Sequence, residues 1–269
     1  MTFPHLVIFT DLDGTLLDPL TYRWGPARPA LEALKRAGIP LVLCSSKTRS
    51  EMEVIREALR NTDPFVVENG GAVFVPPGTF PEVDLPGRHG YQVLEFGLPH
   101  ARLVEALDTL RRETGVLAKG FSELTVPEVA ELTGLPLEAA VLAQRREYDE
   151  PFLIPAGTEP GGIERWARAA GLRVTGGGRF FHLTGDHDKG RAVAQLVTWF
   201  REWDSMVRTA GLGDSANDLS MLHVVDRAFL VAKPDGTHEP TSRHAEILQV
   251  PGVGPVGWNQ AVLALLAEG

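Results

Sequence analysis

The stretch IFTDLDGTLLD, Ile8–Asp18, decides the fold because it takes a buried apolar run directly into a pair of carboxylates. The run LVIF, which overlaps its start, predicts a strand inside a parallel sheet. In such a sheet ligands bind beyond the carboxyl ends of the strands, so Asp11 and Asp13 are expected to face one small site. Two carboxylates this close repel, so one must be protonated or a cation must lie between them. The alternative interpretation is an ordinary Asp-Gly turn.

Outward from this stretch, short β-branched runs alternate with longer amphipathic ones, the pattern of βαβ units around a parallel sheet. Pro40–Cys44 predicts the second strand, after a helix over Pro29–Ala37. Thr48 and Glu51 form a capping box that opens the next helix. The segment 65–76, FVVENGGAVFVP, predicts two short strands around a Gly-Gly turn. We therefore expect an α/β fold with a Rossmann-like parallel sheet.

The alternation of strands and helices gives way to a different pattern, of helices and mostly short strands, from about Pro81 to Asp186. The first pattern returns at Lys189. We predict a discontinuous core of 1–82 and 185–269, with an inserted α+β domain of 83–184. The insertion is expected to hold helices over 100–113, 127–134, 136–147 and 162–170, and the strands YQVLEF, VLAK, PFLI, LRVT and RFFHL. The core resumes with helices over 190–203, 217–222 and 257–267 and strands over 205–213 and 228–232. Gly176–Gly178 predicts a tight turn between strands.

Composition excludes several classes of protein. The chain has 269 residues, 43% of them apolar, enough for one large domain or for a core with a smaller second domain. A net charge of -9 argues against binding to nucleic acid or to an anionic membrane. The single cysteine, Cys44, excludes an intramolecular disulfide framework. No basic leader and no run of about 18 apolar residues is visible, so we expect a cytoplasmic protein.

A second group of acids follows a later predicted strand. In GLGDSANDLSML, Asp214 stands at the strand end, and Asn217 and Asp218 lie in the first turn of the next helix. Asp214 and Asp218 can converge on a hard cation such as Mg²⁺, which prefers oxygen ligands. The helix macrodipole favours an acid near a helix N-terminus, which explains one of these residues but not the cluster.

Two other strand ends supply groups suited to an anion. Ser45 and Ser46 precede a helix N-terminus, where hydroxyls and free amides can meet a phosphate, although either serine can instead cap the helix. Lys189 falls near the first turn of a helix, the end where a cation is electrostatically unfavourable. This placement indicates an anionic partner, and a solvated surface lysine is the alternative.

These residues together resemble a known family. DLDGT at Asp11–Thr15, the strand ending in Ser45, Lys189 in DKG, and GDSAND at Gly213–Asp218 resemble the four signatures of the haloacid dehalogenase-like (HAD) phosphatase superfamily. The insertion resembles the α/β cap of its sugar-phosphatase branch (Cof-type, C2B cap). Within that branch the phrases CSSKTRSE, PFVVENGGAVFVP and REYDEPF resemble the mannosyl-3-phosphoglycerate phosphatases.

The resemblance implies a role for each matching residue. Asp11 would attack phosphorus to form an aspartyl-phosphate, and Asp13 would protonate the leaving alkoxide and then deprotonate water. Mg²⁺ would be held by the Asp11 carboxylate, the Asp13 backbone carbonyl and Asp214. Ser45 and Lys189 would bind the phosphoryl oxygens. Asp218 would orient Lys189, and Asn217 would support the water shell of the metal.

Substrate-binding residues are less sharply defined by the sequence. Lys47 and Arg49 could meet a glycerate carboxylate, and a solvated helix start is the alternative. Further candidates near the core crevice or in the cap are Ser46, Glu68, Asn69, Gly70, Arg145, Arg146, Tyr148, Asp149, Glu150 and His182, each of which could instead be a turn or surface residue. Asp18 is expected to be a turn residue and His187 to belong to the hinge.

The resemblance implies a Mg²⁺-dependent phosphoric monoester hydrolase that converts mannosyl-3-phosphoglycerate to the compatible solute mannosylglycerate. A glucosyl-3-phosphoglycerate, sucrose-phosphate or generic sugar phosphatase is an alternative, as is a phosphotransferase of the phosphomannomutase kind. A phospho-acceptor or sugar-phosphate sensor without turnover is disfavoured, because such a protein does not need the proton shuttle of Asp13. A phosphorylated sugar-glycerate is the expected partner, with no nucleic acid and no membrane.

Overall fold

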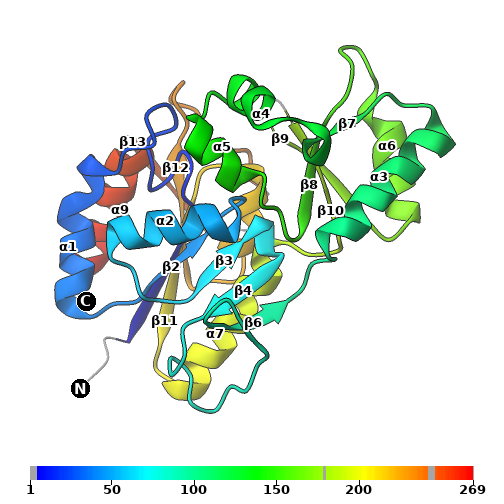
Figure 1. Cartoon of the computed structure of the whole chain (residues 1–269). Helices are drawn as coiled ribbons and strands as arrows, with labels where there is room; N and C mark the ends of the chain where they lie inside the picture. The colour runs from blue at the N-terminus through cyan, green and yellow to red at the C-terminus, as the bar shows by residue number, and fades with distance from the viewer. Residues whose placement is uncertain (1–4, 178–179, 242–245, 269) are drawn as a thin grey trace. The chain divides into compact units, whose positions relative to one another are not determined.

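The computed structural model describes residues 5–177, 180–241 and 246–268, which fall into two compact units (Figure 1). The first unit comprises Met1–Ser45, Asn61–Leu94 and Asp188–Gly269. The second comprises Ser46–Arg60 and Glu95–His187, so it includes the segment directly after Ser45. The domain limits expected from the sequence, 1–82 with 185–269 and 83–184, stay predictions.

The described part of the first unit is built on a nine-stranded sheet in the order β13-β12-β11-β1-β2-β3-β4-β6-β5. From β13 to β3 every strand runs parallel to its neighbours, whereas β4 is antiparallel to β3 and β5 is antiparallel to β6. The expected parallel sheet is therefore confirmed. The strands are β1 Leu6–Thr10, β2 Leu41–Cys44, β3 Phe65–Val67, β4 Ala72–Val75, β5 Gly87–Arg88, β6 Tyr91–Glu95, β11 Arg208–Gly213, β12 Arg227–Ala232 and β13 Ile247–Val253.

The central strands end close to one level, and this alignment positions the site. Thr10, the last residue of β1, pairs with Leu212 of β11 and with Leu43 of β2. The Asp11 N–H continues the ladder to the Leu212 carbonyl at 2.9 Å. Because the strands are parallel, the residues that follow them leave at the same edge of the sheet. Those residues are Asp11, Ser45 and Asp214.

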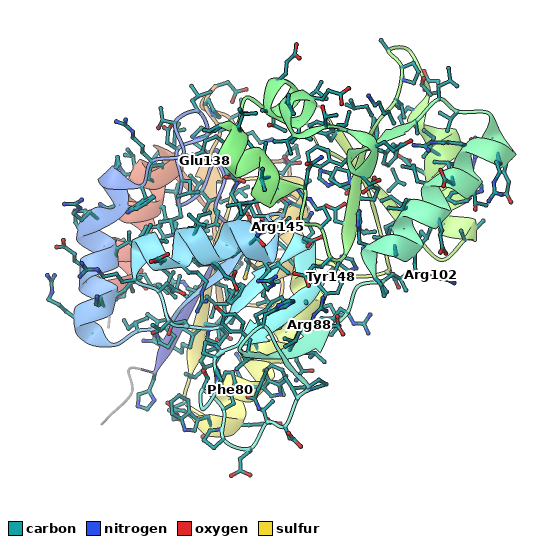
Figure 2. All side chains as sticks on the ribbon, viewed as in Figure 1. Phe80, Arg88, Arg102, Glu138, Arg145 and Tyr148 are labelled. Atoms are coloured by element: carbon teal, nitrogen blue, oxygen red, sulfur yellow. The ribbon has the colours of Figure 1, made fainter. Side chains whose placement is uncertain are left out.

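Helices complete the first unit: α1 Arg28–Ala37, α7 Lys189–Trp203, α8 Leu219–Leu222 and α9 Gly254–Ala267, with the 3-10 turns η1 Gly25–Ala27, η2 Glu68–Gly70 and η4 Ala216–Asp218. Trp258 of α9 is fully buried, and its Nε1 donates to Thr10 Oγ1 at 2.9 Å. Phe80, labelled in Figure 2, packs on Trp199 and Phe200 of α7, with ring centroids 5.7 and 4.9 Å away. The Trp258 contact fixes α9 on β1, and the Phe80 contacts fix α7 against the loop that follows β4.

The second unit holds an antiparallel sheet of four strands in its described part, in the order β7-β8-β10-β9. Successive residues of a strand point to opposite faces. Phe152 and Leu183 therefore pack against α3 and α6, whereas Phe180 joins the cluster of α4 and α5. The elements are α2 Arg49–Leu59, α3 His100–Thr114, β7 Lys119–Gly120, η3 Phe121–Glu123, α4 Val126–Thr133, α5 Leu137–Ala143, β8 Asp149–Leu153, α6 Pro160–Ala169, β9 Arg173–Gly177 and β10 Phe180–Thr184.

Several expected elements have different ends. The capping box is confirmed, because the Thr48 N–H donates to Glu51 Oε2 at 2.9 Å and the Glu51 N–H donates to Thr48 Oγ1 at 3.2 Å. The expected strand VLAK contributes only its last residue to β7, and the expected helix 136–147 ends at Ala143. Strand β13 was not expected, because Pro251 interrupts its apolar pattern.

Two further expectations can be placed. Gly176 lies in β9, and Gly178 of the expected turn lies outside the described residues. Among the residues that the structure describes, no helix is long and apolar enough to cross a membrane.

Candidate active site

Lys189 is a buried cation among the described residues of the first unit. It begins α7, and its side chain has no exposed surface. Its Nζ donates to Asp11 Oδ1 and to Asp218 Oδ1, each at 2.6 Å. Burial opposes the charge, but the Asp11 and Asp218 carboxylates outweigh burial and raise the pKa of Lys189. The unfavourable position at a helix N-terminus is thus offset by two anions, and the surface-lysine alternative does not hold.

Three carboxylates gather around this lysine. One oxygen each from Asp11, Asp214 and Asp218 lies within 4.8 Å of the other two. Burial and the Asp218 charge raise the pKa of Asp11 well above its usual range, although Lys189 opposes the shift. The same two causes, burial first, raise the pKa of Asp214 to about 7. One ammonium does not compensate three carboxylates, of which Asp11 and Asp218 are buried and Asp214 is half-buried, so a proton or a cation must relieve their repulsion.

The donors in this cluster suit a hard divalent cation. All three are carboxylate oxygens, the ligand type that Mg²⁺ prefers, and the excess charge would be neutralised by such an ion. Gly14 makes room for the cluster, because its φ is +81° and a Cβ there would lie 2.6 Å from Asp214 Oδ2. The residues present therefore fit Mg²⁺.

Asp218 braces the loop that carries Asp214. Its Oδ2 accepts from the backbone N–H groups of Asp214 and Ser215, both at 3.1 Å. Its Oδ1 accepts from Lys189. The residue is completely buried. Asp218 therefore joins the start of α7 to the end of β11.

Asp13 lies in a tight loop between β1 and the following segment. Asp13 and Leu17 form an isolated bridge, and the Gly14 N–H donates to the Leu17 carbonyl at 3.0 Å. Asp13 is half-buried. Asp18, beyond the loop, accepts from the backbone N–H groups of Leu20 and Thr21 at 3.1 and 2.8 Å, which is the geometry of an Asx turn.

Thr15 is a site residue to which the sequence interpretation gave no role. It is fully buried, and its Oγ1 donates to Asp214 Oδ1 at 3.2 Å. The sequence DLDGT could have indicated this role, because Thr15 directly follows the Asp-Gly turn and its hydroxyl can reach groups at the carboxyl ends of the strands. Only the structure identifies its acceptor as Asp214.

Ser45 and the loop η2 meet at the end of β2 and β3. Ser45 is fully buried, and its N–H donates to the Val66 carbonyl at 3.1 Å. Its own carbonyl accepts from the Asn69 N–H at 3.0 Å. The Asn217 Nδ2 donates to Asn69 Oδ1 at 3.0 Å. The structure thus brings three of the predicted site residues, Ser45, Asn69 and Asn217, into one chain of contacts.

In the second unit, the segment after Ser45 is engaged with the loop before β8. Arg49 Nε donates to Glu147 Oε1 at 2.9 Å, and its Nη1 donates to both oxygens of Glu53 at 2.9 and 3.0 Å. The Ser46 carbonyl accepts from Arg146 Nη1 at 2.8 Å. The Arg49 guanidinium is therefore neutralised by two carboxylates, and Lys47 beside it is half-buried.

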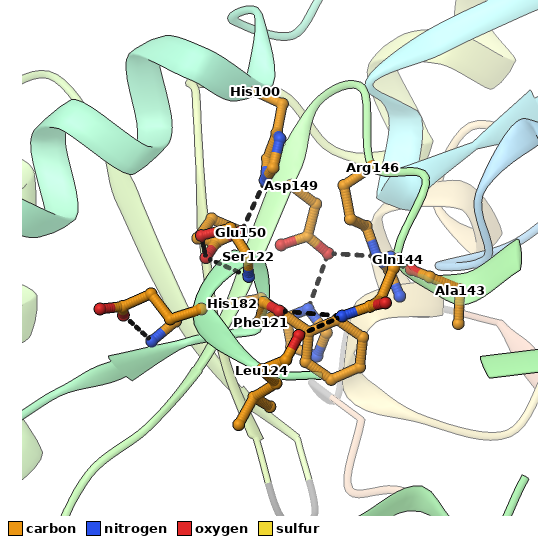
Figure 3. A network of polar contacts seen from close by, with 12 residues as sticks. His100, Phe121, Ser122, Leu124, Ala143, Gln144, Arg146, Asp149, Glu150 and His182 are labelled. Carbon is orange, nitrogen blue, oxygen red and sulfur yellow. Dashed lines mark hydrogen bonds and ion pairs between the residues drawn. The ribbon is translucent and has the colours of Figure 1, made fainter. Parts of the chain in front are cut away.

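Asp149 is the centre of a polar network on one face of the second sheet (Figure 3). It is fully buried, and His182 Nδ1 lies 2.7 Å from its Oδ2. Arg146 Nη1 lies 3.5 Å from the same oxygen, and the Arg146 Cζ lies over the Phe121 ring, 5.7 Å from its centroid. Burial opposes ionisation, but His182 and Arg146 outweigh burial and lower the pKa of Asp149. Among the described residues, Asp149 Oδ1 accepts no hydrogen bond.

The Glu150 side chain lies on the opposite face of the same sheet. Its Oε1 accepts from the N–H and the hydroxyl of Ser122 at 3.0 and 2.7 Å. Its Oε2 lies 2.5 Å from His100 Nε2. Glu150 is fully buried, so it ties η3 to the start of α3 (Figure 3).

The remaining candidates of the second unit differ in exposure. Tyr148 is buried, and its hydroxyl donates to Glu95 Oε1 at 2.5 Å. Arg145 is exposed on the loop after α5 (Figure 2). His187 is buried, and a Cβ at Gly97 would lie 3.1 Å from its Cε1. Of these three, only Arg145 presents its side chain to solvent.

Comparisons with known proteins agree with this geometry. Residues 8–79 match a family described as haloacid dehalogenase-like hydrolase. The chain is 45% identical to a glucosyl-3-phosphoglycerate/mannosyl-3-phosphoglycerate phosphatase of Methanococcoides burtonii, over 97% of each chain. It is 39% identical to a mannosyl-3-phosphoglycerate phosphatase of Pyrococcus furiosus, over 91% of this chain and 97% of that one.

Solved structures share the fold at low identity. A crystal structure from Thermoplasma acidophilum aligns with a TM-score of 0.67 at 17% identity, covering 97% of each chain. A phosphatase of the HAD enzyme superfamily from Bacteroides thetaiotaomicron aligns with a TM-score of 0.64 at 19% identity, covering 99% of this chain and 97% of that one.

Proposed function

Because this chain belongs to the haloacid dehalogenase-like hydrolases, among the phosphatases named for glucosyl- and mannosyl-3-phosphoglycerate, we propose that it hydrolyses mannosyl-3-phosphoglycerate to mannosylglycerate and phosphate. Glucosyl-3-phosphoglycerate is the expected second substrate, since the relative of Methanococcoides burtonii carries both names. The observation that carries the proposal is the buried contact of Lys189 with Asp11 beside the acidic cluster.

Asp11 is the proposed nucleophile. Its carboxylate attacks phosphorus, the bond from phosphorus to the glycerate oxygen breaks, and an aspartyl-phosphate forms. Lys189, already in contact with Asp11, and Ser45 offer hydrogen-bond donors to the phosphoryl oxygens. Catalysis of this kind rests on positioning and on neutralising charge, which a buried ammonium provides without reorganisation.

Asp13 is the proposed proton carrier. It gives a proton to the leaving glycerate oxygen in the first step. In the second step it takes a proton from the water that attacks the aspartyl-phosphate, so phosphate is released and both acids return to their starting states. Its half-buried position next to the loop of Gly14 keeps it beside Asp11 without adding it to the acidic cluster.

The acidic cluster is the proposed Mg²⁺ site. Asp11 and Asp214, with the Asp13 backbone carbonyl, would hold the ion, while Asp218 remains engaged with Lys189. When bound, Mg²⁺ supplies neutralisation of charge on the nucleophile and on the phosphoryl group. Asn217 supports this site from the first turn after β11.

The second unit is proposed to recognise the sugar and the glycerate. The polar network of Asp149, His182 and Arg146 carries an unpaired buried carboxylate oxygen among the described residues, and sugar hydroxyls are donors that suit such an oxygen. Arg145, exposed on the loop after α5, is the cation proposed for the glycerate carboxylate, since Arg49 already pairs with Glu53 and Glu147. Lys47 stays a candidate for the same carboxylate.

A substrate panel tests the proposal. Phosphate release is measured with Mg²⁺ on mannosyl-3-phosphoglycerate, glucosyl-3-phosphoglycerate, sucrose 6-phosphate and mannose 1-phosphate. We expect the two glycosyl-3-phosphoglycerates to have the highest kcat/KM. Conversion of mannose 1-phosphate to mannose 6-phosphate without net phosphate release would instead identify a phosphotransferase. Binding of all four compounds without turnover would identify a sensor.

A further inference from the structure

The loop η2, Glu68–Gly70, has a backbone that is unusual for its residue types. Three successive residues have positive φ: 46° at Glu68, 57° at Asn69 and 95° at Gly70. Positive φ is strained for most residues with a side chain, and only Gly, Asn and Asp adopt it with ease. Glu68 is also fully buried. A loop of this kind persists only where its surroundings hold it in place.

Asn69 makes two contacts that hold the loop, and each goes to a residue of the site. Its N–H donates to the Ser45 carbonyl at 3.0 Å. Its Oδ1 accepts from Asn217 Nδ2 at 3.0 Å. The Asn217 amide is oriented from its other end, because Ser215 Oγ donates to its Oδ1 at 2.5 Å. Asn69 therefore links the end of β2 with the turn that follows β11.

Gly70 brings the same loop against a third element of the site. A Cβ at this position would lie 2.1 Å from the Asp188 carbonyl oxygen and 2.9 Å from the backbone nitrogen of Lys189. The loop thus packs without a gap on the first turn of α7, where Lys189 begins the helix. Three segments that are far apart in the sequence meet at η2.

We propose that Asn69 is a positioning residue for phosphoryl transfer, acting through Ser45 and Asn217 rather than by contact with substrate. The inference rests on the proposed function and assigns a role within that site. Asparagine suits the position for two reasons. It adopts the left-handed backbone conformation with little strain, and its side-chain oxygen accepts a hydrogen bond from Asn217. The sequence interpretation placed Asn69 among the residues that bind substrate, and the geometry points to this indirect role instead.

Two variants separate the backbone from the side chain. Asn69→Gly keeps the left-handed conformation and removes the contact with Asn217. Asn69→Asp keeps both the conformation and the acceptor oxygen. Arg60→Gly is the matched control, because Arg60 is exposed, has a φ of 53° and lies outside the site. Thermal unfolding of all three variants shows whether they fold.

The kinetic readout is the split between kcat and KM for p-nitrophenyl phosphate, a monoester without sugar or glycerate. We expect Asn69→Gly to lower kcat by about tenfold with a change in KM of less than about twofold, the effect of one lost hydrogen bond felt in the transition state. Asn69→Asp should recover most of the kcat. Arg60→Gly should match the wild type.

A double-mutant comparison locates the effect. Asn217→Ala combined with Asn69→Gly should lower kcat no further than the larger single change, because both remove the same contact. A raised KM for mannosyl-3-phosphoglycerate with unchanged kcat in Asn69→Gly would overturn the inference and make Asn69 a substrate ligand. A kcat equal to that of Arg60→Gly would overturn it as well.

The test remains decisive if the proposed function fails. Should the wild type hydrolyse p-nitrophenyl phosphate but no glycosyl-3-phosphoglycerate, the proposed substrate is wrong while the kcat comparison still judges Asn69. Should the wild type turn over no ester, calorimetric binding of orthovanadate with Mg²⁺ replaces kcat, because orthovanadate imitates the five-coordinate transition state of phosphoryl transfer. Weaker orthovanadate binding in Asn69→Gly, recovered in Asn69→Asp, supports the inference, and unchanged binding contradicts it.

Discussion

Lys189 Nζ lies 2.6 Å from Asp11 Oδ1, and this ammonium has no exposed surface. The same nitrogen lies 2.6 Å from Asp218 Oδ1. A buried cation held between two carboxylates is in place before any phosphate arrives, so the donor needs no reorganisation when charge develops. The contact also explains how a lysine is tolerated at the first position of a helix.

Loss of this ammonium should abolish most of the activity. Lys189→Met leaves Asp11 and Asp218 without their common partner, and we expect kcat to fall by more than about a hundredfold, the size seen when a preorganised donor is removed. Phosphate release measures the change. Lys119→Met is the control, since Lys119 is exposed and pairs only with Glu128 in the contacts described. Near-normal activity of Lys189→Met would contradict the assignment.

Gly14 should be intolerant of any side chain. Its φ is +81°, and a Cβ would lie 2.6 Å from Asp214 Oδ2. Gly78 has the same φ but no atom within 4 Å of its Cβ position. Gly78→Ala should therefore cost about 1 kcal/mol of unfolding free energy from backbone strain alone. Gly14→Ala should lose at least the same unfolding free energy and also most of the activity. Urea unfolding measures the first change, and phosphate release measures the second.

The acidic cluster should respond to Mg²⁺. A divalent cation relieves the repulsion among Asp11, Asp214 and Asp218, so saturating Mg²⁺ should raise the thermal midpoint above that in EDTA. Asp214→Asn removes one ligand and should reduce this shift strongly. Asp235→Asn, at an exposed turn, should keep it. An equal shift in both variants would place the ion elsewhere.

Asp149 should contribute to stability in a pH-dependent manner. His182 and Arg146 lower its pKa in the folded state, against the effect of burial. The stability that ionised Asp149 contributes is therefore complete above its unfolded-state pKa of about 3.9. This stability is lost as the pH falls through the lower pKa that Asp149 has in the folded state. Asp149→Asn should be less stable than the wild type by about 1–3 kcal/mol at pH 7, and the difference should shrink below pH 4.

Urea unfolding between pH 7 and pH 2.5 measures this difference. Glu138→Gln is the control, because Glu138 is exposed on α5 (Figure 2), and its difference from the wild type should stay flat. A constant gap between Asp149→Asn and the wild type down to pH 2.5 would show that the Asp149 charge is not stabilised by its neighbours.

Strong local patterns predicted the central strands of the first unit and the start of α2 in the second. LVIF and PLVLC are apolar runs, and the Thr48 and Glu51 spacing is that of a capping box. Strand β13 escaped prediction because Pro251 and Gly252 break its pattern, whereas its pairing with β12 depends on long-range packing. Helix α9 begins at Gly254 rather than near Gly257, because its first turn contains Gly254, Pro255 and Gly257, which weaken the helical pattern in the sequence.

At the site, the sequence predicted which residue types gather at the strand ends but not which atoms meet. The placement of Lys189 at a helix start indicated an anionic partner, and the structure identifies Asp11 and Asp218. The pairing of Arg49 with Glu147 joins residues far apart in the chain, so no local pattern shows that this guanidinium is neutralised. The same holds for Glu150, whose partners His100 and Ser122 come from other elements.

The central claim is that Asp11 carries the reaction on a glycosyl-3-phosphoglycerate, and phosphate release from mannosyl-3-phosphoglycerate tests it most directly. Asp18→Asn supplies the control from the same stretch, because Asp18 caps a turn away from the acidic cluster. We predict that the wild type and Asp18→Asn turn over at similar rates, and that Asp11→Asn loses more than about a thousandfold in kcat. Substantial turnover by Asp11→Asn, or none by the wild type, would contradict the account.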